Sequence, residues 1–142
     1  MVEMTSFEII SRKEFDLVRI TDRVREFAEN SGVKNGLVYV ITNHTTTGVF
    51  VNESLECLEV DIEKFLGDLI PTVKDYAHNH FLPSYGATGN NCPGHLKSLV
   101  VGNHSVIPIK DGKMFGGAAQ EIYFAEFDGI QLRKVQIVVM GE

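Results

Sequence analysis

Five histidines are the residues of this chain best suited to bind a metal ion or to move protons near neutral pH. They are His44, His78, His80, His95 and His104. No pair of them has the spacing of a zinc finger or of the helical His-Glu-x-x-His motif. Spacing alone therefore leaves two interpretations open. Some of the histidines ligate a metal or act as a general base, or each is a surface or hydrogen-bonded core residue.

His44 belongs to the polar stretch "NHTTTG", which separates two apolar runs. Thr45, Thr46 and Thr47 supply three hydroxyls, and Gly48 permits a close backbone approach. Hydroxyls and free backbone N–H groups at a turn can bind an anion such as phosphate. Threonine is also a β-branched residue that suits an ordinary strand edge, so the stretch predicts either a site or a plain strand end.

Carboxylates and a lysine follow other apolar runs. Glu53 suits the start of a helix, or the role of general base or magnesium ligand. Glu126 and Asp128 precede a turn glycine, which fits a solvated turn as well as a site. Lys97 follows His95 by two residues, and on a strand this spacing puts both side chains on one face. The pair predicts either a contact with a phosphate or an exposed strand surface.

The elements that must position these residues follow from the hydrophobic periodicity. Helical spacing and stop signals predict two helices, over residues 21–32 and 54–71. Alternation or continuous apolar runs predict strands at residues 6–12, 15–21, 36–43, 48–54, 95–102, 105–109, 113–115, 121–127 and 134–141. Because the strands cluster without a helix between each pair, the sequence predicts an α+β domain with a mainly antiparallel, sandwich-like sheet and two helices.

Two connections stand out. Asp111-Gly112 lies between "IPIK" and "KMF" and predicts a two-residue hairpin turn. Residues 71–94 have no periodicity and are rich in glycine, proline and asparagine. A loop of this length in a compact domain is usually functional or mobile, and this one carries His78 and His80.

Length and composition limit the function classes. The 142 residues predict one domain over residues 1–142. A net charge of −6 argues against nucleic-acid binding. No window is long and apolar enough for a membrane helix, and the N-terminus lacks the pattern of a signal peptide. Two cysteines, Cys57 and Cys92, favour a reducing, cytoplasmic environment.

Five separated segments together are similar to one known family. They are "NHTTTGVFVNE", "GHLKSLVVG", "IPIKDGKM", "QEIYFAEFDG" and "KVQIVVMGE". Their order and spacing resemble the YjbQ-type family, also described as the secondary thiamine-phosphate synthase family, from about Phe7 to the C-terminus. The resemblance implies an α+β sandwich-like fold, a homotrimer, and a pocket near the subunit boundary lined by histidines and acids. It also implies a weak thiamine-phosphate synthase activity.

The resemblance is carried over residue by residue. It falls on His44, Thr45, Thr46, Asn52, Glu53, His95, Lys97, Gln120, Glu126, Phe127, Asp128 and Gly129. Family members often carry a histidine where this chain has Pro93, and a tryptophan where it has Ala119. The long loop offers His78 or His80 as the substitute for the missing imidazole.

The first hypothesis is an enzyme that joins a pyrimidine diphosphate to a thiazole phosphate and releases pyrophosphate. The catalytic candidates are His44, Glu53, His95 and Glu126. The candidates for binding the phosphorylated metabolite are Thr45, Thr46, Asn52, Lys97 and Gln120. A divalent metal, zinc or magnesium, is expected on His44, His78 and His95. The alternatives are a metal-assisted hydrolase of a small phosphorylated or acyl metabolite, and a non-catalytic module that binds a metal or an anion.

Overall fold

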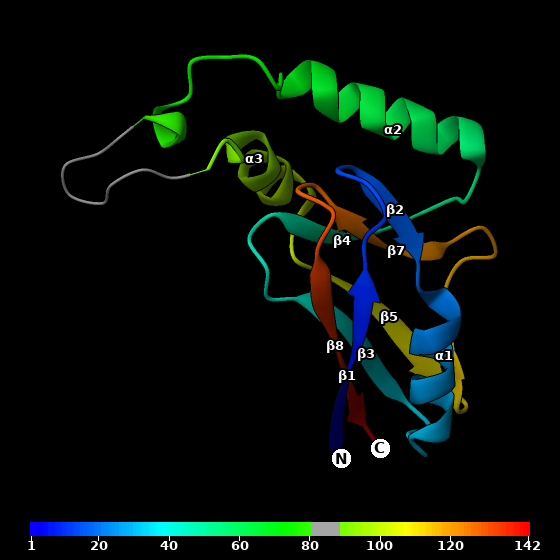
Figure 1. Cartoon of the computed structure of the whole chain (residues 1–142). Coiled ribbons are helices and arrows are strands. Elements are labelled where there is room, and N and C mark those ends of the chain that lie inside the picture. The colour runs from blue at the N-terminus through cyan, green and yellow to red at the C-terminus, as the bar shows by residue number, and fades with distance from the viewer. Residues whose placement is uncertain (81–88) are drawn as a thin grey trace.

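The chain folds into two antiparallel sheets and three α-helices in the computed structural model, which describes residues 1–80 and 89–142 (Figure 1). The larger sheet has the strand order β1-β8-β3-β5-β6 and the smaller one β2-β7-β4. The strands are β1 (Val2–Ile10), β2 (Asp16–Arg19), β3 (Gly36–Thr42), β4 (Thr47–Asn52), β5 (His104–Lys110), β6 (Lys113–Met114), β7 (Glu121–Glu126) and β8 (Leu132–Gly141). The helices are α1 (Thr21–Asn30), α2 (Glu56–Leu69) and α3 (Cys92–Val101), with a 3₁₀ turn at Ala77–Asn79.

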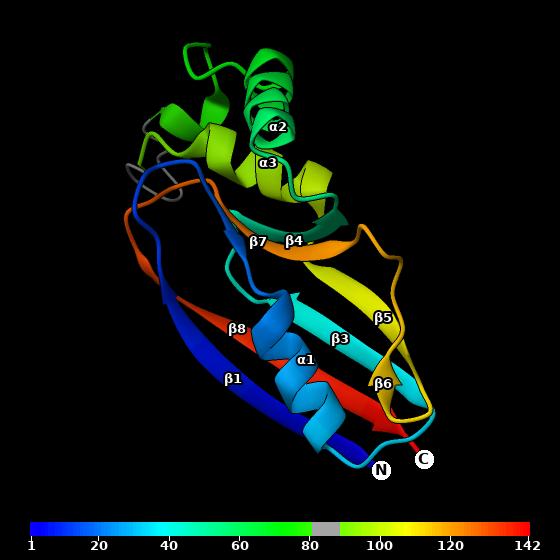
Figure 2. The ribbon, with the colours of Figure 1, turned by 90° about the vertical axis from the view of Figure 1, so that its right-hand side faces the viewer.

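The elements form layers, which Figure 2 shows from the side: α2 and α3 lie on the small sheet, and the small sheet faces the large one. The main core lies between the two sheets and against α1, where the inward residues of β3, β5 and β8 meet Val49, Ile122 and Phe124 of the small sheet. A second core of Leu66, Ala125 and Phe127 lies on the other face of the small sheet. The expected α+β class and antiparallel, sandwich-like arrangement are confirmed.

The strand patterns explain this packing. In β5 buried and exposed residues alternate strictly, because only one face of the large sheet meets the core. In β7 every residue from Ile122 to Glu126 is buried. This strand is central in its sheet, and it has the main core on one face and the second core on the other. The Asp111-Gly112 hairpin is also confirmed, since both residues have positive φ angles (52° and 78°), as a primed turn requires.

One predicted strand is wrong. Residues 95–102 were expected as a strand, but Cys92–Val101 form α3. Pro93 in the first helical turn is a favoured helix-start residue, and the valines at the end of the segment, which favour a strand, are outweighed by packing of α3 against β4. The described residues therefore form three α-helices rather than two. His95 and Lys97, two apart on a helix, do not share a face.

The predicted loop of residues 71–94 is only partly described. It contains the 3₁₀ turn, with Asn91 as the residue that precedes α3. Its residues 81–88 lie outside the described residues. Within residues 1–80 and 89–142, none of the helices combines the length and the apolar character needed to cross a membrane.

Candidate functional site

A buried ion pair joins the end of β7 to the start of β8. Arg133 Nε donates to Glu126 Oε1 at 2.8 Å, and Arg133 Nη2 donates to Glu126 Oε2 at 2.7 Å. Glu126 is 0% exposed and Arg133 is 7% exposed. Two parallel N–H···O bonds between ionised groups form a strong and directional contact, so the orientation of both side chains is fixed.

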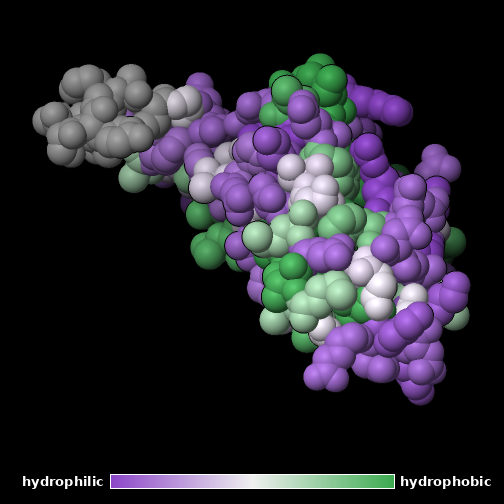
Figure 3. Space-filling view, turned by 90° about the horizontal axis from the view of Figure 1, so that it is seen from below, coloured by the Kyte–Doolittle hydropathy of each residue, from purple (hydrophilic) through white to green (hydrophobic). Residues whose placement is uncertain are grey.

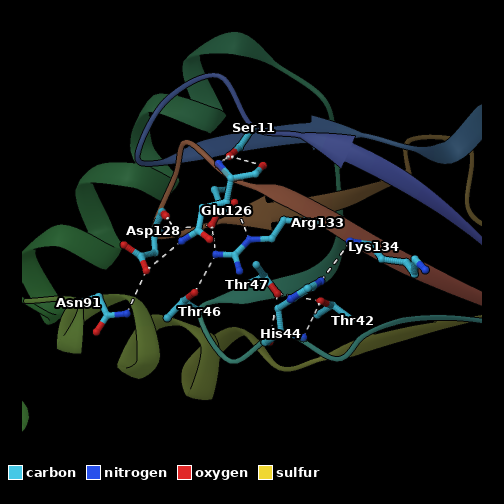
Figure 4. Close-up of polar contacts among 11 residues, drawn as sticks. Ser11, Thr42, His44, Thr46, Thr47, Asn91, Glu126, Asp128, Arg133 and Lys134 are labelled. Carbon is cyan, nitrogen blue, oxygen red and sulfur yellow. Dashed lines mark hydrogen bonds and ion pairs between the residues drawn. The ribbon is translucent and has the colours of Figure 1, made fainter. Parts of the chain in front are cut away.

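The ion pair also holds the main chain around it (Figure 4). Arg133 Nη2 donates to the Thr46 hydroxyl at 2.8 Å, and the backbone N–H of Asp128 donates to Glu126 Oε2 at 3.0 Å. The N–H of Phe127 donates to the carbonyl of Thr46 at 3.1 Å. Both oxygens of Glu126 therefore accept hydrogen bonds within the protein. This geometry gives Glu126 a positioning role, and its catalytic role stays a prediction.

His44 lies in the turn between β3 and β4, beside this pair. The hydroxyls of Thr42 and Thr47 are 2.8 Å apart, and the Thr47 hydroxyl also donates to the His44 carbonyl at 3.1 Å. Outside the turn, the backbone N–H of Lys134 donates to His44 Nε2 at 3.0 Å. Because Nε2 accepts this bond, the neutral ring carries its proton on Nδ1.

The surroundings favour that neutral ring. Burial lowers the pKa of His44 below its ordinary value, and the positive charge of Arg133 lowers it further, while Glu126 opposes the shift. A neutral imidazole is the form that accepts a proton or binds a metal. The lowered pKa of His44 favours the protonation state that its predicted role requires, although Nε2 accepts the bond from the Lys134 N–H.

A pocket of about 400 Å³ lies next to the ion pair, between α2, the first turn of α3 and the segment that precedes β2. Its lining includes two lysines, Lys13 and Lys97, and three carboxylates, Glu14, Glu63 and Asp128, together with Phe15 and Asn91. The ammonium of Lys97 lies 5.5 Å from the centre of the Phe15 ring. Lysine side chains at the wall of a concave site can hold an anion, so the pocket suits a small ligand that carries a phosphate.

The first turn of α3 packs directly on the turn that carries the ion pair. A Cβ atom on Gly94 would lie 3.0 Å from the carbonyl oxygen of Phe127 and 3.4 Å from side-chain carbons of Thr46. Only glycine permits this approach without displacement. A larger pocket of about 640 Å³ runs along β1, β2 and the start of α1, but none of the predicted site residues lines it.

Two of the three predicted metal ligands lie together. The rings of His78 and His95 have centroids 4.9 Å apart and are tilted by 59°. Within residues 1–80 and 89–142, no three His, Cys, Asp or Glu side chains are grouped so as to hold a metal ion. The set of His44, His78 and His95 therefore stays a prediction, and His80 bonds to Asp75 at 2.5 Å.

The remaining predicted residues lie elsewhere. Thr45 is exposed in the turn next to Thr46. Asn52, Glu53 and Gln120 lie at the far end of the small sheet, because Thr47 pairs with Glu126 and Asn52 pairs with Glu121. Five residue steps along an antiparallel strand span roughly 17 Å. Within one chain the predicted site residues of the small sheet therefore form two separate groups. Thr46 and Glu126 lie at one end of the sheet, and Asn52, Glu53 and Gln120 lie at the other.

Three residues at the site are not among those predicted from the sequence: Arg133, Asn91 and Lys13. A signal for Arg133 was present, because it occupies the first inward position of the series Arg133, Val135, Ile137 and Val139 in β8. A charged residue in a buried strand register requires a partner of opposite charge. Asn91 and Lys13 reach the pocket through tertiary packing and had no local signal.

The fold and the site define a class: an α+β protein of two facing antiparallel sheets, with a pocket lined by lysines and carboxylates beside a buried Arg–Glu pair. The chain belongs to the UPF0047 protein YjbQ-like family, whose model matches residues 5–142. A UPF0047 protein of Methanothermobacter thermautotrophicus is 34% identical over 92% of this chain and 86% of its own length. The UPF0047 protein YugU of Bacillus subtilis is 29% identical over 97% of this chain and 99% of its own.

Solved structures agree with this assignment. A YbjQ-like protein of unknown function from Sulfolobus solfataricus superposes with a TM-score of 0.92 at 28% identity, over 100% of this chain and 99% of that one. An uncharacterised conserved protein of the yjbq/upf0047 family from Clostridium acetobutylicum superposes with a TM-score of 0.86 at 31% identity, over 96% of this chain and 99% of that one.

Proposed function

We propose that the protein is a small-metabolite enzyme that resembles a thiamine-phosphate synthase and works in the pocket at the start of α3. The observation that carries the proposal is the presence of Lys97 and Lys13 in the lining of one pocket of about 400 Å³ together with Asp128. In the proposed reaction a thiazole phosphate displaces pyrophosphate from a pyrimidine diphosphate. Negative charge gathers on the leaving oxygens, and fixed positive groups lower the barrier to their departure.

A divalent metal, zinc or magnesium, would add to this charge stabilisation as a Lewis acid. His78 and His95 are the side chains in the described part of one chain that are best placed to hold it. Two imidazoles are fewer donors than a zinc or magnesium site uses, so the described residues of one chain do not complete a site. We therefore assign no step of the reaction to a metal.

The test is steady-state turnover of both substrates with magnesium. We expect Lys97→Ala to lower kcat/KM on the order of a hundredfold, the typical effect of removing one group that stabilises developing negative charge. Lys64→Ala is the matched control, because Lys64 is an exposed lysine of α2 that pairs with Asp68 outside the pocket. Equal rates for the wild type and the Lys97 variant would refute the proposal.

The His78–His95 pair favours a second candidate, a metal-assisted hydrolase of a small phosphorylated or acyl metabolite. This candidate predicts metal in protein purified without added metal, and turnover of simple phosphoesters or esters. A non-catalytic module that binds a metal or an anion is the third candidate, and it predicts binding without turnover of either substrate class.

We further propose that the chain forms a homotrimer and that subunits share the site. The outward face of the large sheet carries exposed Val2, Leu37 and Met140, which lie side by side in the register, and Met4 and Val106 follow on the same face. In Figure 2 α1 lies on the other side of this sheet. Figure 3 looks onto the end of the molecule that carries the termini, where hydrophobic residues lie between hydrophilic ones.

Exposed apolar faces of this kind commonly mark subunit interfaces. The separation of Asn52, Glu53 and Gln120 from Glu126 within one chain also fits a site completed by a second subunit. Light scattering coupled to size-exclusion chromatography should give three times the chain mass of 15.8 kDa. A mass of one chain at micromolar concentration would exclude the trimer.

A further inference from the structure

Asp128 is the acidic residue of the pocket that the fold holds most firmly. Its backbone N–H donates to Glu126 Oε2 at 3.0 Å, and its carbonyl accepts from Gln131 Nε2 at 2.9 Å. Asp128 Oδ2 accepts from Asn91 Nδ2 at 2.9 Å (Figure 4). The buried Arg133–Glu126 pair therefore acts on the pocket through Asp128, whose main chain it fixes.

One oxygen of this carboxylate remains available. Asp128 Oδ2 accepts the bond from Asn91 and a longer one from Gln131 at 3.4 Å. Asp128 Oδ1 has no hydrogen-bond partner within residues 1–80 and 89–142. Asp128 is half-buried and lines the pocket. An ionised carboxylate oxygen can only accept hydrogen bonds, so it requires a donor in a ligand or in solvent.

Asn91 holds the other oxygen of Asp128 in place. Its amide nitrogen must face Asp128, because the carboxylate accepts and cannot donate, and its carbonyl oxygen then points away. That oxygen is buried and has no hydrogen-bond partner in the described part of the chain. Next to the two lysines, which suit an anion, the pocket thus presents the free Oδ1 of Asp128, which suits a donor.

We propose that the ligand of this pocket carries an amino group in addition to its phosphate, and that Asp128 Oδ1 accepts a hydrogen bond from that amino group. Glu126 and Arg133 are then positioning residues, and Asp128 determines which phosphorylated ligands bind. This inference rests on the proposed function only in that the ligand is phosphorylated. An amino group is favoured over a hydroxyl because an ammonium facing a carboxylate forms the stronger, charge-assisted bond.

Two simple probes of nearly equal shape test the inference. Phosphoethanolamine carries a phosphate and an ammonium, and n-propyl phosphate replaces the ammonium with a methyl group. By isothermal titration calorimetry, we expect the wild type to bind phosphoethanolamine about tenfold more tightly, the effect of one charge-assisted hydrogen bond. The ratio of the two dissociation constants is the readout, because a general change in charge affects the shared phosphate of both probes.

Asp128→Asn is the variant that addresses the assigned oxygen. Its amide oxygen can still accept the bond from Asn91, and its NH₂ group then faces the ligand as a donor instead of an acceptor. We expect the roughly tenfold preference to disappear while n-propyl phosphate still binds. Glu63→Gln, which changes an exposed carboxylate of α2 that also lines the pocket, should keep the preference.

The outcomes separate the two proposals. Equal binding of both probes to the wild type, or a preference that survives in the Asp128 variant, overturns the role of Asp128 and leaves the phosphate pocket intact. Failure of the wild type to bind either probe overturns both this inference and the proposed phosphate pocket. A wild type without the preference overturns the role of Asp128 even if the Asp128 variant does not fold.

Discussion

Replacement of Arg133 with methionine is expected to lower the free energy of unfolding by about 3–5 kcal/mol. The substitution leaves the Glu126 carboxylate 0% exposed and without its cation. It also removes the donor to the Thr46 hydroxyl. Because a domain of this kind is stable by only about 5–15 kcal/mol, the loss is a large fraction of the total.

The measurement is chemical denaturation of the wild type and the variant, compared at their midpoints. Lys134→Met is the matched control, since Lys134 is the next residue of β8, its side chain is exposed, and its contact to His44 is made by the backbone. We expect the control to change the free energy of unfolding by no more than about 0.5 kcal/mol. An Arg133 variant that unfolds at the wild-type midpoint would contradict the buried ion pair.

A second substitution isolates the cause. Adding Glu126→Gln to the Arg133 variant removes the unpaired charge but keeps an amide oxygen that can accept the N–H of Asp128. The double variant should therefore be more stable than the Arg133 variant alone, because the penalty for an isolated buried charge exceeds that for a neutral polar group. If the second substitution lowers stability further, the effect of Arg133 is packing and not charge.

Local patterns predicted much of this fold. The alternation in β5 and the Asp111-Gly112 turn give the β5–β6 hairpin directly, because both depend on neighbouring residues. The segment of α3 was predicted wrongly, since its valines favour a strand locally while the helix is stabilised by contacts with β4 that lie far away in the sequence. One such contact is the approach of Val101 to Gly48. It is so close that a Cβ atom added to Gly48 would lie 2.7 Å from a side-chain carbon of Val101.

In the candidate site, too, residue types were predictable from local sequence, whereas their contacts depend on residues far apart in the chain. Thr46 and Glu126 were selected from the sequence, and the structure brings both to the Arg133 guanidinium. The link between them depends on the pairing of β4 with β7 and on the approach of β8, which belongs to the other sheet, and a sequence pattern does not specify which strands become neighbours. For the same reason, the placement of Glu53 at the opposite end of the small sheet could not be foreseen from its type or spacing.

Gly129→Ala is expected to lower the free energy of unfolding by about 1–3 kcal/mol or more, the usual cost of overpacking. A Cβ atom at this position would lie 2.1 Å from the carbonyl oxygen of Lys13 and 2.9 Å from the Ser11 hydroxyl. The Lys13 oxygen belongs to the backbone and cannot rotate away. Its segment is also held close, because the Gly129 N–H donates to the Glu14 carbonyl at 3.0 Å.

Gly67 lines the same pocket, but its replacement with alanine is not expected to lower stability. Gly67 lies within α2, and a Cβ atom there would meet no atom within 4 Å. Alanine is the better helix former by about 1 kcal/mol, so this variant should be as stable as the wild type or more stable. Chemical denaturation should therefore place the Gly129 variant below the wild type in stability and the Gly67 variant at or above it. Equal stability of the Gly129 variant and the wild type would mean that the two segments do not approach as closely as the structure places them.

The Gly129 substitution should also weaken ligand binding. Lys13 and Glu14 form one wall of the pocket, and Asp128 forms another, so the added methyl group must separate the walls. We expect n-propyl phosphate to bind the Gly129 variant more weakly than the wild type even where the variant remains folded. The reason is that the contact of Gly129 with the Lys13–Glu14 backbone sets the distance between Lys13 and Asp128. Unchanged affinity in a destabilised variant would show that the contact supports the fold without shaping the pocket.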